Sequence, residues 1–218
     1  MYTQVKVSSA QRITEVREFL DFFVPLIPAP PVATPRHLNA CKGLVFVQLY
    51  GIIEYTISAT IAKTIDIINN EAVKLQDLKY VIWGMALNPE FDSLIDTNSR
   101  KWDKRYELFQ KVLGNNNANI SNNIMPTNGQ NFTQPQLQSI WQTFNISEPI
   151  FHDVAFGNRL QEIVRHRCNI AHGNESAAEI GARVTHMDLY NRLNEVSNYC
   201  TYLISVFEDY IDQGEFIM

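Results

Sequence analysis

The most constraining feature of this sequence is one long run in which apolar residues recur every three or four positions. The run extends from about Leu38 to Val73, and its β-branched residues taken alone would also permit a strand. Its length and helical period exclude a strand and predict a long helix with a continuous apolar stripe. The stripe consists of Val45, Leu49, Ile52, Ile53, Ile57, Ile61, Ile65 and Ile68.

One acidic residue, Glu54, falls inside this apolar run. A carboxylate in such surroundings is rarely buried unless it has a partner. We therefore expect Glu54 to be partly buried and to form an ion pair, and a functional role is the alternative.

Helical periodicity also marks shorter segments on both sides of this run, and no alternating strand pattern occurs. The chain has 218 residues, which suits one domain, and we expect residues 1–218 to form a single all-α, antiparallel helical bundle with additional helices. The Asn88-Pro89 pair is expected to end the helix predicted for Gln76–Ala86. The predicted helices are Ala10–Val24, Gln76–Ala86, Lys101–Leu113, Gln134–Asn145, Phe156–Ala171 and His186–Ile211.

Two segments lack any helical period. Residues 25–37 contain five prolines and predict an extended connector, since proline lacks the amide donor and disfavours helix before it. Residues 114–133 are rich in asparagine and cannot bury enough apolar surface to offset the entropy of ordering, so they predict a long mobile loop.

Composition restricts the classes of protein to which the chain can belong. A net charge of −5 argues against a protein that coats nucleic acid by neutralising phosphates, although a small local cationic site is compatible with it. Three cysteines without CxxC spacing suggest reduced thiols, and no metal-ligand or cofactor motif is present. The first twenty residues have no signal-peptide core and no membrane span is expected, so a cytoplasmic location is predicted.

One short segment, Ile163–Asn174, has an unusual concentration of basic and polar residues. Basic residues also stabilise the carbonyl end of any helix, so composition alone leaves an ordinary helix end as one interpretation. The segment contains Arg165, His166, Arg167, Asn169, His172 and Asn174.

Helix geometry separates these side chains. At 100° per residue Arg165 and Asn169 share a face with His172, whereas Arg167 lies about 140° from His172. A histidine at a helix C-terminus can act as a proton donor, and a neighbouring arginine can hold a phosphate through two hydrogen bonds. These are the groups that metal-independent cleavage of RNA by a ribose 2′-hydroxyl needs.

The string Arg167-Cys-Asn-Ile-Ala-His172-Gly resembles the Arg-x4–6-His signature of the HEPN superfamily. The resemblance is specific over a motif-bearing core, residues 156–211, which includes the long final helix. A long earlier helix with an acidic residue among apolar ones, as at Glu54, also matches the family's layout. The resemblance is to members found in bacterial toxin–antitoxin and phage-defence systems.

This resemblance implies a homodimer whose two motifs face one composite cleft and cut RNA, such as tRNA or mRNA, without a metal. His172 would be the general acid or base, and Arg167 with Arg165 would clamp the phosphate. Asn169 would orient or bind the substrate, while the other polar residues of the segment and Glu54 would have supporting roles. A cognate antitoxin or a defence-system protein would be a further partner.

The sequence departs from the family pattern at Cys168, where many active relatives have Asn, Asp or His. If Arg165 were the motif arginine instead, the spacing would be x6 and His166 would occupy the following position. Two other functions therefore remain open. One is a non-catalytic HEPN module that binds nucleotide, RNA or a partner protein, and the other is a purely structural dimerisation bundle.

Overall fold

The computed structural model describes residues 1–96, 99–127 and 131–218, and within them the fold is all-α, as predicted. Short 3-10 turns join some of the helices, and the only β-type pairings in the described residues are two isolated bridges. The helices are α1 (Thr3–Phe23), α2 (Arg36–Asn70), α3 (Trp83–Ala86), α4 (Asn88–Asp96), α5 (Lys101–Leu113), α6 (Gln134–Phe144), α7 (Phe156–Ala171), α8 (Ala177–Ala182) and α9 (His186–Asp212).

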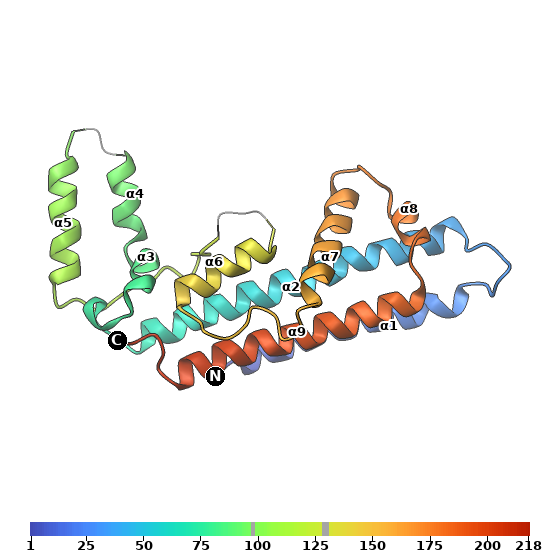
Figure 1. Ribbon diagram of the computed structural model, residues 1–218, viewed down its shortest axis with the longest axis horizontal. Helices are drawn as coiled ribbons and strands as arrows, with labels where there is room; N and C mark the ends of the chain where they lie inside the picture. The colour runs from blue at the N-terminus through green and yellow to red at the C-terminus, as the bar shows by residue number, and fades with distance from the viewer. Residues whose placement is uncertain (97–98, 128–130) are drawn as a thin grey trace.

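The helix α2 forms the axis of the bundle (Figure 1). The helices α1, α2 and α9 lie along the long axis of the molecule, with α1 antiparallel to the other two, and α7 and α8 pack against α2 as well. All eight residues of the predicted stripe are buried. By length and composition α2 could cross a membrane, but 56 % of its most apolar window is buried inside the fold, as expected for a core helix.

Hydroxyl groups join α1 to the buried side of α2. The Tyr2 hydroxyl and the Thr64 hydroxyl are 2.6 Å apart, and those of Ser9 and Thr56 are 2.9 Å apart. Each of these buried polar groups therefore has a partner, which avoids the free-energy penalty of leaving it unpaired.

The closest approach between two helices occurs where α8 crosses the start of α2. A Cβ atom added to Gly43 would lie 2.0 Å from the carbonyl oxygen of Ala177, and one added to Gly181 would lie 1.8 Å from that of Asn39. Only glycine at both positions allows the two backbones to come this close. The crossing fixes the segment that follows α7 against the N-terminal part of α2.

Three parts of the predicted helix pattern are wrong. The first helix begins at Thr3 and not at Ala10, since its first turns bury small polar residues such as Ser8 and Ser9, which give no apolar period. The segment Gln76–Ala86 is not one helix but consists of the turns Leu75–Asp77 and Tyr80–Ile82 followed by α3. The Trp83 indole donates a hydrogen bond to the Leu75 carbonyl across these turns, over 2.8 Å. In addition, the Asn88-Pro89 pair was expected to end a helix, but it lies at the start of α4. Proline is tolerated there because the amides in the first turn of a helix have no partner within the helix.

The two irregular segments differ in how they are held. Contrary to the prediction, the connector between α1 and α2 is not extended throughout, because it contains the 3-10 turn Val24–Leu26 and a second turn in which the Val32 amide donates to the Ala29 carbonyl over 3.2 Å. The helix α2 begins at Arg36, slightly before the end of the predicted connector. The predicted loop 114–133 lies within the described residues apart from 128–130. The Asn69 side chain accepts from the Ile120 amide and donates to the Ile120 carbonyl, at 2.9 and 2.8 Å, which anchors this segment to α2.

The α2–α8 crossing gives a first prediction. Gly43→Ala and Gly181→Ala should each lower the free energy of unfolding by about 1–3 kcal/mol or more, because the new methyl group overlaps backbone atoms that cannot rotate away. Gly51→Ala is the matched control on α2, since a Cβ there meets nothing within 4 Å. It should be neutral or stabilising by up to ~1 kcal/mol. Chemical denaturation measures all three, and equal stabilities would contradict the tight crossing.

Candidate active site

The basic segment lies at the C-terminal end of α7, whose bounds match the predicted helix. The Gly173 amide donates to the Ile170 carbonyl and the Asn174 amide donates to the Asn169 carbonyl, over 3.2 and 2.9 Å. Gly173 has a φ of +71°, so these bonds form a left-handed helix end. His172 is the last residue before this reversal, and Asn174 serves the turn through its backbone.

His172 and Arg165 are both exposed and lie on the same face of the end of α7, as helix geometry predicts. Neither side chain forms a hydrogen bond or an ion pair with another described residue. Both groups are therefore accessible to a ligand that approaches this face.

Arg167 is half-buried and is held by groups from two other parts of the chain. Its guanidinium lies 4.7 Å from the centre of the Tyr50 ring on α2, a cation–π contact, and donates to the Asn131 side-chain oxygen over 3.2 Å. The Tyr50 hydroxyl in turn accepts from the Phe132 amide at 3.1 Å. Burial raises the pKa of Tyr50, which keeps its hydroxyl neutral.

Tyr50 and Asn131 were not among the residues selected from the sequence. Tyr50 lies in the long apolar helix, where a tyrosine is unremarkable, and Asn131 is one of many asparagines in its loop. The Asn-rich segment thus includes a residue that contacts Arg167, a connection that local pattern did not indicate.

Asn169 has a partner of its own near the end of α7. Its amide donates to a Glu175 oxygen at 2.5 Å, and the other Glu175 oxygen is 2.6 Å from the Arg183 guanidinium. The hydrogen bonds from Asn169 and Arg183 lower the pKa of Glu175. This bridge connects α7, the turn after it and the end of α8.

His166 is the one buried histidine among the described residues of the motif segment. Its ring packs 4.7 Å from that of Phe46 on α2, and its Nδ1 has no hydrogen-bond partner among the described residues. Burial, with a smaller contribution from the positive charge of Arg165, lowers the pKa of His166 and favours the neutral ring. The position of this side chain indicates a packing role.

Glu54 is half-buried, as expected, but the ion pair predicted for it does not occur among the described residues. Its negative charge contributes to the raised pKa of Tyr50, and the charge of Arg167 opposes it. Arg167 contacts Tyr50 and Asn131 instead of forming an ion pair with this carboxylate.

The structure thus divides the arginines and histidines of the motif segment into three groups. Arg165 and His172 share an exposed face, Arg167 is held beside α2, and His166 is buried. No hydrogen bond or ring contact joins Arg167 to His172 within the chain, in keeping with their separation around the helix.

A comparison with protein families finds a match to RiboL-PSP-HEPN over residues 8–209, which is most of the chain. The chain belongs to the RiboL-PSP-HEPN family. Membership confirms the resemblance of the chain to HEPN proteins and agrees with its all-α fold, and the family suggests a nuclease or RNA-related role. Comparisons with curated proteins and with solved structures found no match.

The helix end of this HEPN domain provides a second prediction. Gly173→Ala should lower the free energy of unfolding by about 1–2 kcal/mol, because a Cβ disfavours a left-handed backbone. The substitution tests backbone strain without steric overlap, since no atom lies within 4 Å of the position of that Cβ. Gly173→Asn is the matched control and should be destabilised less, because asparagine tolerates this conformation. Equal losses in urea unfolding would contradict this assignment.

The burial of His166 provides a third prediction, on pH. The pKa of His166 is lower in the folded state than its ordinary value of 6.5, so this histidine binds a proton more readily in the unfolded chain. Its neutral ring therefore costs no stability above about pH 6.5, and the free energy of unfolding declines as the pH falls below that value. His166→Leu should remove part of this decline when denaturation is measured between neutral and mildly acidic pH. His186→Leu, at an exposed position, should retain the wild-type decline. A decline in His166→Leu as steep as that of the wild type would contradict the prediction.

Proposed function

We propose that this HEPN protein is a metal-independent endoribonuclease that cleaves RNA by attack of a ribose 2′-hydroxyl on the adjacent phosphate. The observation that carries the proposal is the placement of the two ends of the motif. His172 is exposed at the end of α7, and Arg167 is held in place by Tyr50 and Asn131.

In this reaction the 2′-oxygen forms a bond to phosphorus while the bond from phosphorus to the 5′-oxygen breaks. The products are a 2′,3′-cyclic phosphate and a free 5′-hydroxyl. An imidazole near neutral pH can accept the proton of the attacking hydroxyl or donate one to the leaving oxygen, and His172 would do so. Arginine would stabilise the charge that develops on the phosphate oxygens.

A homodimer is part of this proposal. Because Arg167 and His172 point to different sides of α7, one chain alone does not direct both at the same phosphate. Two copies with facing motifs could combine His172 and Arg165 of one with Arg167 of the other in a composite cleft.

A non-catalytic binding module is the second candidate, and two observations favour it. The residue after Arg167 is Cys168, whose sulfur lies 3.9 Å from the Arg167 guanidinium, where a polar side chain would offer stronger hydrogen bonds. The nearby amide of Asn169 donates to Glu175. In such a module the same cationic segment would bind a nucleotide, RNA or a partner protein without cleaving it.

The biological setting that we infer is a toxin or phage-defence effector in the cytoplasm. Its substrate would be tRNA or mRNA, and a cognate antitoxin or a defence-system protein would restrain or activate it. These inferences are based on the resemblance of the motif to that of HEPN proteins in such systems.

The fourth prediction tests the chemistry. Wild-type protein incubated with tRNA or total RNA in EDTA should produce fragments that end in a cyclic phosphate, and His172→Ala should lower the cleavage rate by at least ~100-fold. Arg167→Ala should have a comparable effect, because the phosphate charge would lose its stabilising cation. His186→Ala is the control and should remain active.

The result also separates the two candidate functions. If wild-type protein leaves RNA intact but binds it, and if Arg167→Ala weakens that binding, then the non-catalytic module is correct. If Arg165→Ala abolishes cleavage while Arg167→Ala does not, the motif arginine is Arg165.

A further inference from the structure

The arm formed by α4 and α5 carries a stripe of large apolar side chains that nothing covers among the described residues. Trp102, Tyr106, Phe109 and Leu113 are 78, 67, 62 and 77 % exposed. Their spacing of four, three and four residues places them on one face of α5, as in the seam of a helix pair. An adjacent face of α5 already packs on the core through Leu108 and Val112. We call these four residues the α5 seam.

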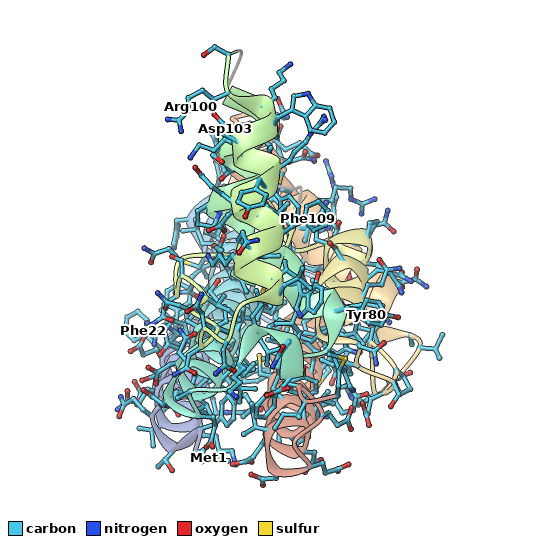
Figure 2. The ribbon with its side chains drawn as sticks, turned by 90° about the vertical axis from the view of Figure 1, so that its left-hand side faces the viewer. Met1, Phe22, Tyr80, Arg100, Asp103 and Phe109 are labelled. Atoms are coloured by element: carbon cyan, nitrogen blue, oxygen red, sulfur yellow. The ribbon has the colours of Figure 1, made fainter. Side chains whose placement is uncertain are left out.

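The arm is placed so that a large partner can reach this seam. In Figure 1 the α4–α5 hairpin projects from one end of the bundle, away from α7 and α8. Figure 2 shows Phe109 of the seam and Tyr80 on one side of the arm, with Arg100 and Asp103 towards the other. Tyr80 is 72 % exposed and extends the apolar surface toward the base of the arm.

The charges beside the seam are largely neutralised within the chain. Lys104 pairs with Glu107 at 2.5 Å, Lys111 pairs with Glu90 at 2.6 Å, and Arg100 pairs with Asp103 at 3.3 Å. The Arg105 guanidinium lies over the Trp102 ring, 4.7 Å from its centre. RNA binding depends on cations that are available to phosphates, so this pairing disfavours RNA as the partner of the seam. A neutral apolar surface is the better match.

We propose that the α5 seam binds the α5 seam of a second copy of this chain. In an antiparallel pair related by a two-fold axis, Trp102 of each copy would lie against Leu113 of the other, and Tyr106 against Phe109. Such an interface needs only a self-complementary surface, and the seam has bulky residues along its whole length.

The exposed area is sufficient for this contact. With about 150–250 Å² for each aromatic side chain, the exposed part of the seam amounts to roughly 500 Å² per chain. Two seams together bury about 1,000 Å², which is the lower limit for a specific interface. Tyr80 and the aliphatic parts of the flanking lysines would add to this area.

This contact is distinct from the dimer proposed for the motif. The α5 seam and the end of α7 lie at opposite parts of the bundle (Figure 1), so a two-fold axis at the seam does not bring two His172 side chains together. The inference therefore does not depend on nuclease activity. If both contacts form, the protein assembles beyond a dimer.

The fifth prediction concerns the mass in solution. Light scattering during size exclusion should give the wild type at least twice the 25.0 kDa of one chain. The double variant Tyr106→Glu/Phe109→Glu should have half the wild-type mass or less, because two carboxylates would have to lose water in each seam. Phe22→Glu is the matched control, since Phe22 is 74 % exposed on α1, outside the arm. It should keep the wild-type mass, and circular dichroism should show that both variants remain helical.

Cross-linking tests the antiparallel order. A mixture of Trp102→Cys and Leu113→Cys should form a disulfide-linked dimer on oxidation, whereas each variant alone should form no more than the wild type does. Each chain in the mixture has only one of the two introduced cysteines, so a disulfide between positions 102 and 113 can only join two copies.

Three results would overturn the proposal. One is a wild-type mass of 25 kDa at the highest concentration reached, and another is an unchanged mass in the double variant. The third is loss of RNA binding in the double variant without any change in mass, which would make the seam an RNA surface instead. Loss of cleavage in His172→Ala with the mass unchanged tests only the nuclease proposal and leaves this one standing.

Discussion

The packing around α2 determines where the site residues lie. This helix is apolar on most of its circumference, so α1, α7, α8 and α9 all pack against it to remove that surface from water. Two of the side chains that contact the motif segment come from the same helix, since Tyr50 contacts Arg167 and Phe46 contacts His166. The glycine crossing with α8 then fixes the chain that leaves His172. A change in how α7 packs on α2 would therefore move Arg167 and His172 together.

Local pattern was enough to predict most of the long elements of the fold. The period of the apolar residues located α2, α7 and α9 because their buried faces repeat over many turns. The short helix α8 has too few turns to show a period, although a capping box of Ser176 and Glu179 begins it. The turns before α3 depend on contacts with distant segments, including the bridge between Leu78 and Ile217.

The candidate site shows the same division between local and tertiary information. Sequence spacing correctly placed Arg165, Asn169 and His172 on one face, because that placement depends only on helix geometry. It could not show that His166 packs against Phe46 or that Asn169 bonds to Glu175, since those contacts depend on how α7 meets α2 and on the turn that follows it. Tyr50 and Asn131 were missed for the same reason, because neither lies near Arg167 in the sequence.

The surroundings of the arginines favour Arg167 over Arg165 as the phosphate clamp of the proposed nuclease. Arg183 is neutralised by the Glu175 carboxylate, so its charge is already balanced. Arg167 is also held in place, but its partners are an aromatic ring and an amide oxygen, and both are uncharged. These contacts limit the freedom of the guanidinium without removing its positive charge, and some of its five N–H donors remain for a ligand. Arg165 is charged and unpaired among the described residues, but it must lose side-chain entropy on binding. A positioned and unneutralised cation is what stabilisation of a developing phosphate charge requires.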